Sequence, residues 1–279
     1  MNQNSNQPNM DSKLTLFAAA GVGAALALFL TRSKSSTGKA EKPILKYWGG
    51  RGLMEISRQM LSIAGLPFDD IRKSNYDGLT PNELDANLGR MPVLEVSNGS
   101  VGQSLAINFY AASICGMMGR NTLEAAQILS IYEHVKECGT AWRKIVPYSV
   151  VPTSDQIETW FDKGADDSTS TAARGNGDRN LTWFMGRIEN AMQNNGFAVG
   201  SSLSLADAMI YNAFAEYLAD DQIPEDKRPM DKWRTEPYAD QARMVAKLKN
   251  YPKISASIQN YGSSSGLQQW LNNRGPQGF

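Results

Sequence analysis

The stretch "KYWGGRGLMEISRQML", residues 46–61, decides how this chain folds. An apolar run ends at Tyr47, a loop rich in glycine follows, and apolar residues then recur at the spacing of an amphipathic helix. The pattern predicts a strand, a glycine-rich loop and a helix in immediate succession. A tyrosine at the end of such a strand can pack into the core, or it can point its hydroxyl at a molecule bound above the loop.

The residues that follow predict a small mixed sheet with helices on its faces. Strands are expected over 43–48, 66–73, 91–96 and 100–101, and helices over 52–64, 80–88 and 104–115. The predicted order over 43–115 is therefore βαβαββα. In its last helix, the residues expected to face the core are Leu105, Ile107, Phe109, Tyr110 and Ile114.

Residues 118–275 predict a second, all-helical unit, in which apolar residues first recur at the helical period over 122–146. Residues 149–180 are polar and rich in glycine, so we expect an extended loop or insertion there. Capping boxes at Thr80 with Glu83 and at Ser204 with Asp207 each predict the start of a helix.

The segments before residue 43 are expected to lie apart from the folded units. Residues 1–13 are polar and predict a disordered tail, and residues 31–42 predict a linker. Residues 14–30 carry no charge and would cover roughly 26 Å as a helix, close to the thickness of a membrane core. More basic residues follow this span than precede it, which predicts a membrane anchor with the folded part facing the cytosol. The alternatives are a cleaved signal peptide and an organellar import sequence.

The composition argues against several other classes of protein. Lys+Arg and Asp+Glu each number 28, so the basic excess expected of a nucleic-acid-binding protein is absent. The single histidine, His134, makes a histidine-based metal site or a Ser-His-Asp triad a poor expectation. Cys115 and Cys138 do not form a C-x-x-C pair, and a reduced compartment is the default.

Three stretches together carry a resemblance to a known family: "LKYWGGRGLMEISRQMLSIAGLPFDD", "NLGRMPVLEV" and "QSLAINFYAA". Over about 43–275 the chain resembles the cytosolic glutathione transferases of the Tyr type. The sigma class, which includes haematopoietic prostaglandin D synthase and the lens S-crystallins, is the nearest. The resemblance implies a thioredoxin-like α/β domain followed by an all-α domain. Because "WGGR" replaces the redox C-x-x-C of thioredoxin-like folds, disulfide exchange is not expected.

The resemblance also implies a function. As a homodimer, the enzyme would activate the thiol of its co-substrate glutathione for conjugation to a small hydrophobic electrophile, or for isomerisation or reduction of one. The alternative is a non-catalytic scaffold of the same fold, or a subunit of a membrane-associated assembly.

The catalytic role implied by the resemblance falls on Tyr47. A free thiol has a pKa near ~8.5, so little thiolate exists at neutral pH. A hydrogen bond from a neutral phenol to the sulfur favours the charged form. Lowering the thiol pKa by ~2 units corresponds to about 2.7 kcal/mol.

The residues that the resemblance assigns to glutathione binding are Arg51, Arg90, Met91, Pro92, Gln103 and Ser104. Pro92 resembles the cis-proline of thioredoxin-like folds, which would turn the backbone of Met91 toward the cysteinyl part of the ligand. Gln103 and Ser104 open a helix whose free N–H groups suit the γ-glutamyl carboxylate, and Ser104 can also serve as a cap.

Other assignments are less complete. Arg51 would either support the site or form an ion pair with Glu55, four residues on. Glu133 is the expected acid that reaches across the dimer to the amine of glutathione. The tryptophan and lysine usual after the second strand of sigma enzymes are not evident, and Lys73 matches only roughly. Candidates to line the electrophile site, each equally compatible with the core, are Met117, Trp142, Tyr148 and Trp270.

Overall fold

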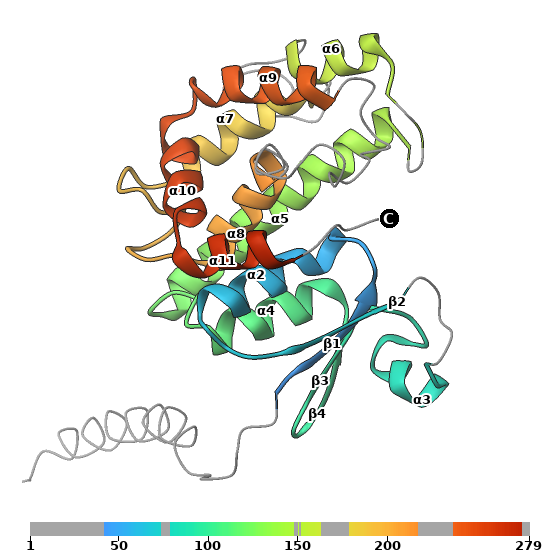
Figure 1. The fold of residues 1–279 in the computed structure, drawn as a ribbon. Coiled ribbons are helices and arrows are strands. Elements are labelled where there is room, and N and C mark those ends of the chain that lie inside the picture. Colours follow the sequence, from blue (N-terminus) through green and yellow to red (C-terminus); the bar gives the residue numbers. More distant parts are fainter. Residues whose placement is uncertain are drawn as a thin grey trace, which may run out of the picture. The chain divides into compact units, whose positions relative to one another are not determined.

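The computed structural model describes residues 42–73, 79–147, 150, 152–162, 179–216 and 237–274. Figure 1 shows a small sheet with helices gathered above it. The expected tail, the expected membrane anchor over 14–30 and nearly all of the expected linker lie outside the described residues. No helix within the described ranges is both long and apolar enough to cross a membrane.

Four strands form the sheet in the order β2-β1-β3-β4. They are β1 (Ile44–Trp48), β2 (Asp69–Lys73), β3 (Val93–Val96) and β4 (Gly99–Gly102). β1 and β2 run parallel, whereas β3 runs antiparallel to both β1 and β4. Val93 at the start of β3 pairs with Lys46 on one side and with Gly102 on the other. The end of β1, the start of β3 and the end of β4 therefore meet at one end of the sheet.

The helices that accompany the sheet complete the expected βαβαββα order. A 3-10 turn (Gly52–Met54) leads into α2 (Glu55–Ile63), which is followed later by α3 (Pro81–Leu84) and α4 (Ser104–Ile114). The capping box of Thr80 and Glu83 is present at the start of α3, as predicted.

The face that α4 turns to the core differs from the prediction. Its buried residues are Ile107, Asn108, Ala111 and Ala112. Phe109 and Ile114, which were expected inside, are 43% and 42% exposed. The small side chains of the alanines allow close packing, and Asn108 bridges two neighbouring helices by accepting from the Ser57 hydroxyl (2.6 Å) and donating to the Tyr132 hydroxyl (3.2 Å). A prediction that counted only large apolar residues could not find this face.

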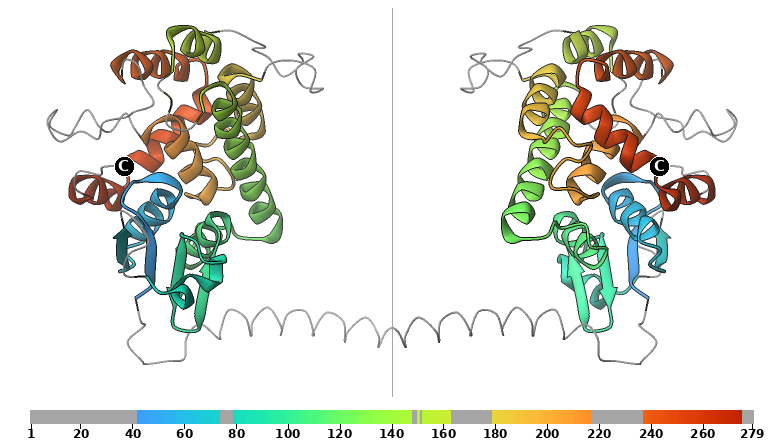
Figure 2. Two further views of the ribbon diagram at one scale, coloured as in Figure 1. Left: turned by 90° about the vertical axis from the view of Figure 1, so that its right-hand side faces the viewer. Right: turned by 90° about the vertical axis from the view of Figure 1, so that its left-hand side faces the viewer.

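Helices make up the rest of the described chain. They are α5 (Thr122–Ile145), α6 (Ser154–Asp162), α7 (Leu181–Ala191), α8 (Leu205–Phe214), α9 (Pro237–Leu248), α10 (Pro252–Gly262) and α11 (Ser265–Asn273). The views in Figure 2 show α5, α7, α8 and α10 close together. The expected thioredoxin-like α/β arrangement followed by an all-α one is confirmed.

The helix α6 corrects the prediction of an extended loop over 149–180. Ile157, Trp160 and Phe161 are buried, and their spacing of three and four residues places them on one face of a helix. The polar composition around them hid this short amphipathic pattern. Residues 163–178, the most polar part of the expected insertion, lie outside the described residues.

A buried carboxylate ties three segments of the helical part together. Asp207 in α8 accepts hydrogen bonds from the hydroxyls of Ser204 (2.7 Å) and Ser257 (2.6 Å) and from the backbone N–H groups of Ser204 and Ala198. The predicted capping box of Ser204 and Asp207 is confirmed. Burial raises the pKa of Asp207, while these four hydrogen bonds act in the opposite direction.

The helix α11 returns to the sheet part of the protein and packs against α2 (Figure 1). Gly266 makes this contact close, because a Cβ added there would lie 2.5 Å from the carbonyl oxygen of Ser62 and 2.6 Å from the Cα of Ile63. Trp270, one turn further along, lies beside Phe68 with a ring-centroid distance of 5.9 Å.

Candidate active site

Tyr47 lies near the end of β1, 8% exposed, with its ring against the glycine loop that follows. The backbone N–H of Leu53 points at the Tyr47 hydroxyl from 3.4 Å. Gly52 has φ +45°, and a Cβ built there would lie 2.8 Å from the same hydroxyl. Only glycine fits this position without moving the ring, so the loop and the phenol are placed by each other.

Buried Arg58 and partly exposed Arg72 hold the carbonyl groups of this loop. Arg58 donates from Nη1 to the carbonyl oxygens of Gly50 and Arg51, both at 3.1 Å, and Arg72 donates to that of Gly49 at 3.4 Å. Both arginines also bind one carboxylate, that of Asp70, at 3.0 Å from Arg58 Nε and 2.6 Å from Arg72 Nε. The loop is therefore fixed by side chains from α2 and β2.

The other expected glutathione-binding residues lie at the same end of the sheet. The Met91–Pro92 peptide bond is cis and immediately precedes β3. Gln103 follows β4 with φ +69°, a left-handed conformation that is uncommon for residues other than glycine, and Ser104 begins α4. Because this end of the sheet also carries Tyr47, the fold brings together residues 47, 91, 92, 103 and 104.

Sequence reasoning missed the residue that links two of these segments. The Asn87 side chain donates to the carbonyl oxygen of Pro92 at 3.0 Å and accepts from the Gln103 amide at 2.8 Å. Arg90 lies nearby and is exposed, with its Nε 3.5 Å from the Asn87 carbonyl oxygen. Nothing in the sequence around Asn87 indicates that its side chain links Pro92 to Gln103.

The ion-pair partner of Arg51 is not Glu55, which the spacing in the sequence offered as a candidate. Its Nη1 lies 2.7 Å from Oε2 of Glu216, two residues after the end of α8. Glu55 is instead 1% exposed and turned toward α11, where it accepts from the Trp270 indole (2.8 Å) and from Arg274 (3.3 Å). An acid and a base three residues apart, Glu55 and Arg58, both on the buried face of α2, were the available signal for this cluster.

The remaining candidates lie apart from Tyr47 or pack into other groups. Glu133 lies in α5 and forms an exposed ion pair with Lys136 at 3.1 Å.

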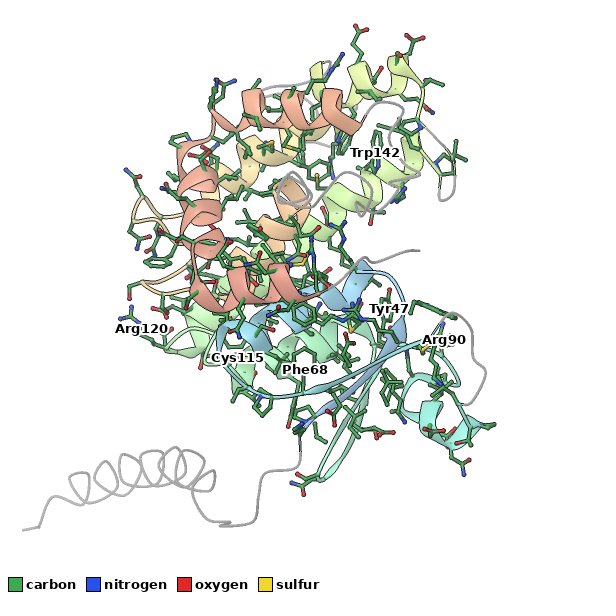
Figure 3. The ribbon with its side chains drawn as sticks, viewed as in Figure 1. Tyr47, Phe68, Arg90, Cys115, Arg120 and Trp142 are labelled. Atoms are coloured by element: carbon green, nitrogen blue, oxygen red, sulfur yellow. The ribbon has the colours of Figure 1, made fainter. Side chains whose placement is uncertain are left out.

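Met117 is buried in the helical core, and Trp142 packs beside Trp160, well away from Tyr47 (Figure 3). Trp270 is engaged with Glu55, and Tyr148 lies outside the described residues.

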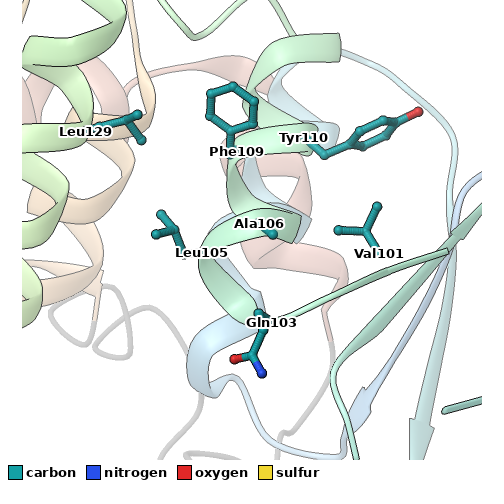
Figure 4. Close-up of a pocket in the computed structure, with 7 residues that line it drawn as sticks. All are labelled: Val101, Gln103, Leu105, Ala106, Phe109, Tyr110 and Leu129. Carbon is teal, nitrogen blue, oxygen red and sulfur yellow. The ribbon is translucent and has the colours of Figure 1, made fainter. Parts of the chain in front are cut away.

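An apolar groove of about 590 Å³ lies beside Gln103, between β4, α4 and α5 (Figure 4). Its lining residues are Val101, Gln103, Leu105, Ala106, Phe109, Tyr110 and Leu129. The aromatic ring of Phe109 and the aliphatic side chains around it leave the groove almost without polar surface.

Two family models match the chain. "Glutathione S-transferase, N-terminal domain" matches residues 43–113, and "Glutathione S-transferase, C-terminal domain" matches residues 155–274. The chain is 26% identical over 242 residues to S-crystallin 2 of Octopus vulgaris, which covers 84% of this chain and 98% of that protein. It is 27% identical over 172 residues to glutathione S-transferase A1 of Bos taurus, which covers 60% of this chain and 70% of that protein.

Solved structures agree on the fold. The glutathione S-transferase from Ascaris lumbricoides has a TM-score of 0.57 at 20% identity, with 84% of this chain and 97% of that one covered. Rat hPGDS in complex with a quinoline has a TM-score of 0.54 at 16% identity, with coverages of 85% and 98%. The two family models cover both parts of the fold, and the expectation of an enzyme that uses glutathione is confirmed. The chain belongs to the glutathione S-transferase superfamily, as a glutathione transferase with glutathione as its co-substrate.

Proposed function

We propose that Tyr47 donates a hydrogen bond to the thiol sulfur of glutathione and so favours the thiolate. The thiolate then forms a bond to an electrophilic carbon of a small hydrophobic substrate, and the leaving group departs with its electron pair. The same activated sulfur would serve an isomerisation or a reduction. The observation that carries this proposal is the convergence of Tyr47, the cis Met91–Pro92 bond and the start of α4 at one end of the sheet.

The same geometry suggests how the tripeptide is held. The backbone N–H and C=O of Met91 would pair with the cysteinyl residue, as an added strand would. The N–H groups at the start of α4, together with Gln103 and Ser104, would bind the γ-glutamyl carboxylate, favoured by the positive end of the helix dipole. Arg51 and Arg90 would add positive charge near the ligand.

A titration tests the role of Tyr47. The pKa of bound glutathione, followed by thiolate absorbance in the ultraviolet, should rise in Tyr47→Phe, and the rate of conjugation should fall by ~10²-fold. Equal thiol pKa values in the two proteins would refute the assignment. If neither protein binds glutathione, the alternative of a non-catalytic scaffold, which the comparisons do not favour, would gain support.

We place the enzyme nearest the sigma class of the Tyr type. Supporting this are the motifs around Tyr47 and Pro92 and the similarity to S-crystallin 2 over 84% of the chain. Conjugation rates over a panel of electrophiles test this class assignment, because sigma enzymes should differ from the other classes in the electrophiles that they accept.

We further propose that two copies pair through the apolar groove beside α4. Phe109 is 43% exposed there, and burial of a large aromatic ring is strongly favourable. Phe109→Asp should convert a dimer to a monomer in sedimentation velocity. Val245→Asp, at an exposed apolar residue of α9 outside the groove, is the matched control and should leave the dimer intact.

We also propose that residues 14–30 anchor the protein in a membrane with the folded part in the cytosol. The support is the uncharged span and the basic residues that follow it. The full chain should stay with membranes in alkaline carbonate and should be digested by protease added to intact vesicles. Release by carbonate would refute the anchor, and a shortened N-terminus recovered from an organelle would favour import.

A further inference from the structure

We propose that α11 sets the position of the loop beside Tyr47 through a chain of buried ion pairs, with Glu216 and Arg274 as positioning residues. This inference rests on the proposed role of Tyr47. Both residues act through other side chains rather than on the sulfur itself.

The loop forms one wall around the phenol. The N–H of Leu53 lies 3.4 Å from the Tyr47 hydroxyl, and Gly52 leaves no room for a side chain between them. The direction of the hydroxyl therefore depends on where residues 50–53 lie. A displacement of a fraction of an ångström would change the hydrogen bond that the phenol offers to a ligand.

Besides Arg72 of β2, two further arginines connect this loop to the rest of the protein. Arg58 donates to the carbonyl oxygens of Gly50 and Arg51. Arg51 is itself part of the loop, and its guanidinium binds Glu216 at 2.7 Å. The loop is thus held from α2 on one side and from the end of α8 on the other.

Residues of α11 and its C-cap join these two supports into a closed ring. Glu55 lies 3.5 Å from Arg58, and it accepts hydrogen bonds from Trp270 and Arg274. Arg274, the residue that follows α11, also donates to Oε1 of Glu216, whose other oxygen binds Arg51. Starting at the loop, the contacts run through Arg58, Glu55, Arg274, Glu216 and Arg51, and so back to the loop.

Burial makes this ring sensitive to the loss of any member. Arg58 is 0% and Glu55 1% exposed, and Arg274 and Glu216 are also buried. A buried charge that loses its partner must hydrate or move, because the low-dielectric surroundings do not compensate it. Neutralising Glu216 would remove the negative charge that lies between the guanidinium groups of Arg51 and Arg274, so the repulsion between these two cations would no longer be offset there. The expected relief is a shift of Arg51, and with it a shift of the loop.

The test compares variants of the ring with variants outside it. Glu216→Gln removes the charge but keeps the shape, and Arg274→Lys keeps the charge but removes the planar fork. Glu124→Gln is the control, because Glu124 pairs with Arg120 at the start of α5, outside the ring. For each variant, the readouts are the thiol pKa of bound glutathione, kcat and KM for an aromatic halide, and hydrogen exchange of the amides at residues 50–53.

Glu216→Gln should raise the bound thiol pKa by about one unit and lower kcat about tenfold, with KM for the halide nearly unchanged. Exchange in the loop should quicken, and Arg274→Lys should show a smaller change in the same direction. Glu124→Gln should match the wild type. A purely structural role would lower the melting temperature without moving the thiol pKa.

The outcomes separate the two proposals. If Tyr47→Phe raises the thiol pKa and Glu216→Gln does not, the positioning role is overturned and the role of Tyr47 stands. If Tyr47→Phe itself leaves the thiol pKa unchanged, both are overturned. If Glu216→Gln does not fold, as judged by circular dichroism, Arg274→Lys decides, and an unchanged thiol pKa with unchanged loop exchange would then overturn the inference.

Discussion

Adding one methyl group at Gly266 should destabilise this protein, although the same change usually stabilises a helix. Alanine is favoured over glycine within helices by about 0.5–1 kcal/mol, because glycine loses more backbone freedom on folding. At Gly266 the new Cβ would lie 2.5 Å from the Ser62 carbonyl oxygen and 2.6 Å from the Ile63 Cα. Both are backbone atoms of α2 and its C-terminal turn, so no side-chain rotation can make room.

The size of the effect follows from the displacement required. Carbon contacts are comfortable at about 3.5 Å, so α11 would have to move away from α2 by about 1 Å. A rigid shift of that size would stretch the Trp270–Glu55 hydrogen bond from 2.8 Å to beyond hydrogen-bonding distance. Overpacking costs about 1–3 kcal/mol, and loss of the Trp270–Glu55 hydrogen bond about 1 kcal/mol. The helix propensity of alanine offsets about 0.5–1 kcal/mol of this, so we expect Gly266→Ala to lose about 1–3 kcal/mol of unfolding free energy.

Gly139 in α5 is the matched control, because an added Cβ there meets no described atom within 4 Å. Gly139→Ala should therefore gain about 0.5–1 kcal/mol. Urea unfolding of the two variants, followed by circular dichroism, should move the midpoints in opposite directions. A Gly266→Ala protein as stable as the wild type would show that α11 and α2 are not in the close contact described.

Three further predictions concern titratable and buried groups. The hydrogen bond from Lys46, and to a smaller extent those from Thr80, lower the pKa of the Glu83 carboxyl to about 2. The contribution of Glu83 to stability is therefore present above pH 4.5 and is lost as the pH falls through 2. Glu83→Gln should accordingly melt below the wild type at neutral pH, and the difference should vanish near pH 2. Asp207→Ala should cost about 3 kcal/mol in urea unfolding, because it removes a helix cap and leaves two serine hydroxyls unpaired; a loss under 1 kcal/mol would contradict this. Burial raises the pKa of Cys115 to about 11, so a disulfide reagent should modify this thiol at pH 8 far more slowly than free cysteine, and denaturant should abolish the difference.

Local patterns were read correctly from the sequence. Both capping boxes are present, since each depends on residues only three apart. The strand that carries Tyr47 and the helix that follows the loop were also predicted, because period-two and period-3.6 patterns are properties of short segments. The resemblance, which rests on several such segments, identified the fold and the family.

Contacts between distant segments could not be read in the same way. Arg51 and Glu216 are 165 positions apart, so nothing near Arg51 indicates that its partner is not Glu55. The short helix α6 was missed because its three buried residues stand among polar ones. The roles proposed for Tyr47 and for the glutathione-binding residues stay predictions, supported by where the fold places them.

The partnership of α2 with α11 has a consequence for synthesis on the ribosome. Glu55 and Trp270 are separated by 215 positions, so at about 5–20 residues per second the acid emerges about 10–40 s before its donor. During that interval the nascent sheet and its first helix carry Glu55 without Trp270 and Arg274, the donors that later bind it. The amino-terminal half should therefore gain its final rigidity only after the later helices have been made, and chaperones that shield exposed surface would have their longest opportunity there.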